Sequence, residues 1–222
     1  MTLKIRPKDP KSQKSKIIEI LRGGGIGVMP TDTIYGLVGR ALDEKAVERI
    51  YVVRKRTPSK PMIILISAVD DLNLLSVKSV SFATPFEARR REKSKFSVPT
   101  FVGTSRANDT DSTQEKLNKL WPGKVSIIFP CPDEKFYYLH RGSNSLAFRL
   151  PNDEYLRDLI SQTGPLVAPS ANLEGMPPAT TIEESEKYFG DEVDFYLDGG
   201  KIEGSPSKLI KMENGKIIEL RK

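Results

Sequence analysis

The sequence of 222 residues predicts a single α/β domain over 1–222, because strand-like and helix-like segments alternate along almost the whole chain. A continuous apolar run such as 62–66 is typical of a strand that is buried on both faces. An amphipathic stretch such as 43–53 is typical of a helix that packs on such a sheet. Hydrophobic residues make up 38% of the chain, which suffices for a packed core.

The first part of the chain carries clear signals for the ends of its elements. Three glycines at 23–25 end the first amphipathic stretch, Pro30 interrupts the following apolar run, and Asp43 is a candidate helix N-cap. The elements expected here are a helix over 12–22, a strand over 26–29, a helix over 43–53, a strand over 62–66 and a helix over 70–75.

Periodicity disappears from about 77 to 112, a stretch rich in Ser, Thr, Arg and Lys. We expect an irregular insertion there. This segment could be a lid, an RNA-contacting arm or an inert loop. Of these three roles, its composition favours the inert loop. The elements expected after it are a helix over 114–120, strands over 125–129 and 146–148, a helix over 153–161, a strand over 166–167, a helix near 183–189 and strands at 209–210 and 217–220.

The charge balance and the cysteine count bear on partners and compartment. A formal net charge of +6 favours anionic partners such as nucleotides, phosphates or RNA, although solvated lysines give the same balance. No apolar run approaches the roughly 20 residues that span a bilayer, and the N-terminus lacks the apolar stretch of a secretory signal. The single cysteine, Cys131, fits a reducing compartment. We expect a cytoplasmic protein that does not contact a membrane.

Residues 29–39, MPTDTIYGLVG, place short polar side chains directly after a predicted strand. Ligands of α/β sheets usually bind at the carboxyl ends of the strands. Thr33 or Tyr35 there can hydrogen-bond a small substrate, and Gly36 lets a ligand approach the backbone. The alternative is a turn that only caps the next element.

Residues 54–62, RKRTPSKPM, combine cations with two prolines. Cations at the end of a helix are favourable for electrostatic reasons alone. Because the prolines stiffen the loop, however, Arg56 and Lys60 are also suited to bind a polyphosphate. The residue types leave both interpretations open.

Three later motifs add polar groups next to predicted strands. In FRLP (148–151), Arg149 ends a strand and can hold a carboxylate. In APSAN (168–172), the serine and the asparagine follow another strand, where a helix cap is the alternative. In GSPSKLI (204–210), a serine precedes a late strand. Trp121 of LWPG (120–123) is expected to pack in the core.

Several common types of site are excluded. The chain has no P-loop and no dinucleotide-binding fingerprint. One cysteine and one histidine cannot form a zinc cluster. A histidine-based triad would depend on His140 alone, which we expect at the surface.

Together and in this order, the motifs MPTDTIYGL, RKRTPSKPM, LWPG, FRLP, APSAN and GSPSKLI resemble the YrdC family, the threonylcarbamoyl-AMP synthases. The resemblance covers nearly the whole chain apart from the insertion, and it corresponds to the short form without an extra C-terminal domain. It implies a twisted mixed sheet with flanking helices around a basic concave pocket. It also implies that ATP, L-threonine and bicarbonate react, with Mg²⁺, to threonylcarbamoyl-AMP and pyrophosphate. A partner transferase then modifies tRNA, so the contact with tRNA is indirect.

The resemblance also implies roles for individual residues. The residues that it assigns to ATP are Arg56, Lys60, Ser145, Ser170 and Arg221. The residues that it assigns to threonine are Thr33, Arg149, Ala168 and Ser207. The residues that it gives a supporting role are Arg54, Tyr35 and Asn172. It assigns no metal ligand, and substrate positioning is the only catalytic role.

Some positions depart from the family pattern. Arg54 stands where the family usually has lysine, Lys124 replaces a proline, and Lys208 replaces a threonine. None of these changes removes an assigned functional group. Two alternatives remain: an RNA-binding module that uses the arginines at 89–91 for weak RNA contact, and an enzyme that carbamoylates another acceptor.

Overall fold

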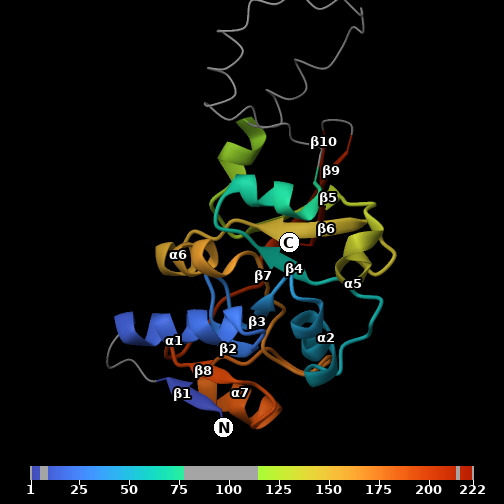
Figure 1. Cartoon of the computed structure of the whole chain (residues 1–222). Coiled ribbons are helices and arrows are strands. Elements are labelled where there is room, and N and C mark those ends of the chain that lie inside the picture. The colour runs from blue at the N-terminus through green and yellow to red at the C-terminus, as the bar shows by residue number, and fades with distance from the viewer. Residues whose placement is uncertain (1, 6–9, 78–114, 214–215, 222) are drawn as a thin grey trace, which may run out of the picture.

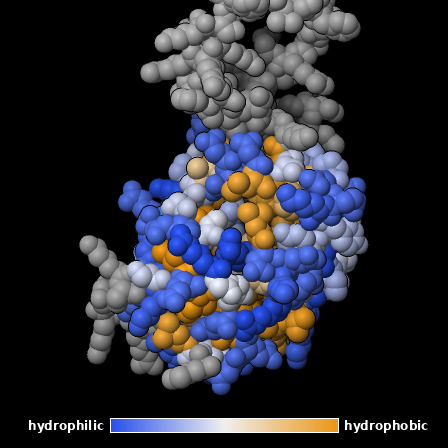
Figure 2. All heavy atoms as spheres, viewed as in Figure 1, coloured by the Kyte–Doolittle hydropathy of each residue, from blue (hydrophilic) through white to orange (hydrophobic). Residues whose placement is uncertain are grey.

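The computed structural model describes residues 2–5, 10–77, 115–213 and 216–221. The predicted insertion at about 77–112 lies outside the described residues except for Val77, and with it the arginines at 89–91. The described residues form a twisted mixed sheet with helices on both of its faces (Figure 1). Hydrophilic residues cover most of the surface seen in Figure 2, with smaller hydrophobic areas between them.

The described strands form one sheet in the order β1-β8-β2-β3-β7-β4-β6-β5-β9-β10. Its pairs are mixed: β4 pairs parallel with β6 but antiparallel with β7. The strands are β1 (Leu3–Ile5), β2 (Gly27–Pro30), β3 (Tyr35–Arg40), β4 (Ile63–Leu65), β5 (Val125–Pro130), β6 (Ser145–Arg149), β7 (Leu166–Val167), β8 (Phe195–Leu197), β9 (Lys208–Glu213) and β10 (Lys216–Arg221).

Three of the described helices begin at a side chain that accepts a hydrogen bond from a free backbone N–H group. Asp43, Asp153 and Thr181 each accept a hydrogen bond from the backbone N–H three residues later, as N-cap residues do. The helices are α1 (Pro10–Arg22), α2 (Glu44–Val53), α5 (Tyr137–His140), α6 (Glu154–Thr163) and α7 (Ile182–Phe189), with 3₁₀ turns η1 (Val69–Leu75) and η2 (Glu134–Phe136). Residues 115–120 are also helical.

Two apolar clusters cover opposite faces of the sheet. Because successive side chains of a strand point to opposite faces, Val28 and Leu37 belong to the cluster with α2, whereas Met29 and Val38 belong to the cluster with α1 and α6. Burial on both faces explains why the central strands are apolar throughout rather than alternating. Packing on both faces sets where the strands lie and therefore where the loops at their ends begin.

Most of the predicted elements are present within one or two residues of their expected bounds. Trp121 packs in the core, as predicted, with 4% exposure, and its indole N–H donates to the carbonyl of Val125 at 2.7 Å. The sequence patterns did not reveal β1, β3, β8 or the η2–α5 segment. Three-residue strands are too short to show a period, and β3 lies within a motif that was interpreted as a polar turn.

The expectation that His140 lies at the surface was wrong. His140 is fully buried at the end of α5. Its Nδ1 accepts from the backbone N–H of Gly142 at 3.2 Å, and its ring packs edge-on against Tyr137. The surrounding polar stretch contains the short helix α5, and both Leu139 and His140 lie on its buried face.

Among the described residues, no helix combines the length and the apolar character that a membrane crossing requires.

Candidate active site

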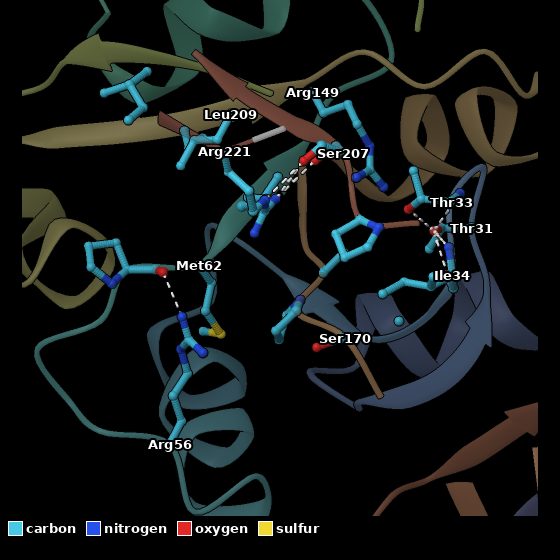
Figure 3. Close-up of a pocket in the computed structure, with 18 of the residues that line it drawn as sticks. Thr31, Thr33, Ile34, Arg56, Met62, Arg149, Ser170, Ser207, Leu209 and Arg221 are labelled. Atoms are coloured by element: carbon cyan, nitrogen blue, oxygen red, sulfur yellow. Dashed lines mark hydrogen bonds between the residues drawn. The ribbon is translucent and has the colours of Figure 1, made fainter. Parts of the chain in front are cut away.

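A cavity of about 460 Å³ lies where the loops after β2, β7 and β8 meet β4, β6 and the β9–β10 hairpin (Figure 3). It contains all the residues that the sequence resemblance assigned to the site except Lys60 and Asn172. The predicted site residues that line it are Thr33, Tyr35, Arg54, Arg56, Ser145, Arg149, Ala168, Ser170, Ser207 and Arg221.

The cavity is strongly cationic. Four arginines line it and, within the described part of the chain, no Asp or Glu does. Arg149 and Thr33 lie toward one side of the cavity in Figure 3, and Arg56 lies toward the other. A concave site with charge of one sign concentrates ligands of the opposite sign, so this cavity is suited to an anionic ligand with more than one charged group.

Arg149 forms a buried ion pair with Asp32. The Arg149 Nη2 atom lies 3.0 Å from Oδ1 of Asp32, and both side chains are at most 5% exposed. Burial raises the pKa of the Asp32 carboxyl, which the positive charge of Arg149 opposes. The ion pair fixes the guanidinium at the end of β6. Asp32 was not among the predicted site residues, although its place within the PTDT motif was the available signal.

The hydroxyl of Thr33 is oriented by Thr31. Thr31 donates its proton to the carbonyl of Ile34 at 2.7 Å, so in the 3.0 Å contact between the two hydroxyls Thr33 is the donor. The lone pairs of the Thr33 oxygen therefore remain available to accept a hydrogen bond in the cavity.

Ser170 and Asn172 of the APSAN motif bind the guanidinium of Arg54. This contact gives the two polar side chains of the motif a structural role. Arg54 donates to the carbonyl and the amide oxygen of Asn172 at 3.0 and 3.1 Å, and to the Ser170 hydroxyl at 3.2 Å. Desolvation by burial, together with nearby Arg56, lowers the pKa of Arg54 to about 10. Its Nη1 atom is buried without a hydrogen-bond partner among the described residues, so the cavity-lining guanidinium keeps one free donor group.

Arg56 and Lys60 lie on a loop that is held by hydrogen bonds between its own residues. Arg56 donates to the carbonyls of Lys60 and Pro61, both at 3.0 Å. The ammonium of Lys60 pairs with Glu174, which also accepts hydrogen bonds from the backbone and the hydroxyl of Thr57. Lys60 is therefore directed toward Glu174 rather than into the cavity.

The loop after β8 forms another wall. The Tyr35 hydroxyl donates to the carbonyl of Gly200 at 2.7 Å and accepts from the N–H of Gly199 at 2.9 Å. Further along, a Cβ atom on Gly204 would lie 1.8 Å from the carbonyl oxygen of Thr33. Only glycine permits this close approach, which brings the loop against the Thr33 turn.

Ser207 at the end of this loop and the three remaining predicted residues, Arg221, Ala168 and Ser145, complete the predicted part of the lining. Arg221 of β10 donates through Nε and Nη2 to the carbonyl of Ser207, at 3.1 and 2.8 Å. Ala168 follows β7, and its backbone N–H donates to the carbonyl of Ile63 in β4 at 3.0 Å. Ser145 begins β6, with its hydroxyl 3.4 Å from that of Ser143. These residues come from separate strands that the sheet brings together.

The family model described as telomere recombination, which covers Sua5, YciO and YrdC, matches residues 19–222. The chain belongs to this family. A putative threonylcarbamoyl-AMP synthase of Methanocaldococcus jannaschii is 28% identical over 95% of this chain and 87% of its own length. The threonylcarbamoyl-AMP synthase of Pyrococcus abyssi is 28% identical over 82% of this chain but only 45% of its own length.

Solved structures share the fold. Sua5 of P. abyssi, solved in complex with L-threonine, aligns over 100% of this chain and 57% of its own, with a TM-score of 0.76 and 24% identity. A protein of Methanobacterium thermoautotrophicum, solved in solution, aligns over 94% of this chain and 85% of its own, with a TM-score of 0.59 and 31% identity. The chain thus spans somewhat over half the length of Sua5.

The Asp32–Arg149 pair predicts a large loss of stability when its acid is neutralised. Asp32→Asn leaves the buried Arg149 without a counter-charge, so we expect the free energy of unfolding to fall by about 3 kcal/mol. Urea unfolding measures it. Glu186→Gln is the matched control, because it breaks the exposed 2.9 Å pair with Lys4, which is worth less than about 1 kcal/mol. Equal losses in the two variants would contradict the assignment.

The Lys60–Glu174 contact predicts a perturbed titration. Hydrogen bonds from Lys60 first, and from Thr57, lower the pKa of Glu174 to about 2. Because the folded-state pKa lies below the unfolded value, this contact stabilises the loop above about pH 4.3 and is lost as the pH falls toward the folded value. In Lys60→Ala we expect the pKa of Glu174 to rise, as measured by carboxyl-detected NMR. Lys201→Ala, which removes an exposed pair with Glu203, should leave it unchanged.

Proposed function

We propose that the chain is an L-threonylcarbamoyladenylate synthase, a nucleotidyltransferase that converts ATP, L-threonine and bicarbonate to threonylcarbamoyl-AMP and pyrophosphate. The observation that carries this proposal is the cavity lined by four arginines and several hydroxyls, without an acidic side chain in its described lining. Its proposed ligands are all anionic or carry an anionic group. Family membership and the names of the relatives support the same reaction.

The side of the cavity with Arg149 binds threonine. The guanidinium, held by Asp32, binds the carboxylate, since a planar fork of donors matches a carboxylate. The free lone pairs of Thr33 accept from the substrate nitrogen, and Ser207 contributes a hydroxyl. Ala168 contributes backbone next to them. Tyr35 supports this end indirectly, because it ties the loop before Ser207 to the Thr33 turn.

The other side binds ATP. Arg56 and Arg54 line this side and face the phosphates, and Arg221 reaches them from its place beside Ser207. Ser145 and Ser170 contact the nucleotide. Asn172 supports this end by holding Arg54. Lys60 contacts ATP only after it leaves Glu174, so binding of the nucleotide exchanges one anionic partner of Lys60 for another.

The reaction needs positioning and charge compensation rather than a covalent enzyme intermediate. Threonine and bicarbonate give a carbamate with loss of water. A carbamate oxygen then attacks the α-phosphorus, the bond from this phosphorus to the bridging oxygen breaks, and pyrophosphate leaves. The nucleophile is already anionic, so no general base is required. The arginines offset the repulsion between the carbamate and the phosphates while they align them.

Mg²⁺ is proposed to arrive bound to ATP. Magnesium commonly binds substrate phosphates and keeps several waters. The described residues hold no group of three or more His, Cys, Asp or Glu side chains that could bind a metal. Asp32 and Glu174 are already paired with the cations Arg149 and Lys60. The phosphates would therefore supply the ion's anionic ligands, and the ion would neutralise part of their charge.

The wider context is part of the same proposal. The single cysteine fits a cytoplasmic enzyme. The product would pass to a partner transferase that modifies tRNA, and contact of this chain with tRNA would be indirect or weak.

The test is a pyrophosphate-release assay with ATP, L-threonine, bicarbonate and Mg²⁺, in which threonylcarbamoyl-AMP is detected by mass spectrometry. We expect product that depends on both threonine and bicarbonate. Arg56→Ala should lower kcat/KM about 100-fold, because it removes a cation that compensates phosphate charge.

Arg22→Ala is the matched control, because Arg22 is an exposed arginine of α1 that does not line the cavity. It should retain wild-type activity. If turnover requires bicarbonate but is faster with another acceptor than with threonine, that acceptor, and not threonine, is the substrate. Folded protein without turnover that binds RNA would overturn the enzyme assignment.

A further inference from the structure

Behind the cavity wall, a buried hydroxyl contacts Ser207. The side-chain oxygens of Ser126 and Ser207 lie 2.8 Å apart, and the two residues are 0% and 1% exposed. Ser126 lies in β5, which pairs in parallel with β9 directly after Ser207, and the N–H of Lys208 donates to the carbonyl of Lys124 at 3.0 Å. Ser207 lines the cavity and Ser126 does not. The pairing of the two strands thus fixes one serine behind the other.

The protons of this contact can be assigned. A guanidinium only donates, so in its 3.4 Å contact with Nη2 of Arg221 the Ser207 oxygen is the acceptor. If Ser126 donates as well, both lone pairs of Ser207 are occupied and its own proton is free. If Ser126 accepts instead, the proton of Ser207 is used within the protein.

The presence of an anion in the cavity decides between these arrangements. An anion next to Ser207 accepts the Ser207 proton in a charge-assisted hydrogen bond, which is stronger than a bond between neutral hydroxyls. Ser126 is then the donor, and no hydroxyl proton of the pair is left without an acceptor. A buried polar group without a partner is costly, so the fully buried Ser126 hydroxyl favours this pairing.

We propose that Ser126 is a positioning residue for the amino-acid substrate: by donating to Ser207, it directs the Ser207 proton to an anionic oxygen of the bound threonine or its carbamate. The identity of this ligand rests on the proposed function. Ser126 itself does not contact the substrate. It acts on binding through Ser207, so it should affect threonine far more than ATP.

The test compares Ser126→Ala with Ser126→Thr in the pyrophosphate-release assay. We expect Ser126→Ala to raise the KM for L-threonine about tenfold, with kcat and the KM for ATP changed less than about twofold. Ser126→Thr keeps the hydroxyl and should stay within about threefold of wild type. The thermal midpoint of each variant verifies that it is folded.

A double-mutant cycle separates positioning from a purely structural role. If Ser126 acts through Ser207, then Ser126→Ala combined with Ser207→Ala raises the KM for threonine no further than Ser207→Ala alone. Additive effects, equal changes in the KM for threonine and for ATP, or failure of Ser126→Thr to restore threonine use would each overturn the inference.

Calorimetric binding of L-threonine to the wild-type protein distinguishes the two proposals. Wild-type protein that neither binds nor uses threonine would refute the proposed function and, with it, this inference. Wild-type protein that uses threonine, with Ser126→Ala indistinguishable from it, would refute only the role of Ser126.

Discussion

The buried pair between Asp32 and Arg149 is the interaction on which the site depends. A charge in the interior persists only when it is paired, and here a carboxylate from the turn after β2 meets a guanidinium from the end of β6. The pair joins two parts of the sheet at the edge of the cavity. It keeps Arg149 charged and fixed without using an acidic group in the described cavity lining.

Two other cations of the cavity are also held in place without an acidic group in the described lining. Arg54 is held by oxygens of the APSAN segment, and Arg221 by the carbonyl of Ser207. Neutral oxygens orient these guanidinium groups and leave their positive charge uncompensated. An anionic ligand therefore meets cations whose positions are already set, so little ordering cost is paid when it binds. Lys60 is the exception, since its partner Glu174 carries a full charge.

Close backbone contacts shape the loop after β8, whose last residue, Ser207, also holds Arg221. Gly204 allows the loop after β8 to touch the carbonyl of Thr33, and Tyr35 fastens the start of that loop. Ser207 follows in the same loop and is held from behind by Ser126. The hydroxyls at this end of the cavity thus depend on neighbours that do not themselves reach a ligand.

The sequence by itself determined the alternation of strands and helices, the N-cap at Asp43 and the motifs of the family, because these are local patterns of period, turn chemistry and residue type. It could not reveal β1 or β8, which are too short for a period, or the burial of His140 within a polar stretch.

Only the tertiary structure decided which side chains meet. Arg54 and Asn172 are 118 positions apart, and Ser126 and Ser207 are 81 apart. The mixed strand order sets these contacts through sheet pairing and core packing, which no local pattern specifies. For the same reason the sequence offered Arg149 as a candidate but could not show that Asp32 pairs with it, or that Lys60 is directed toward Glu174.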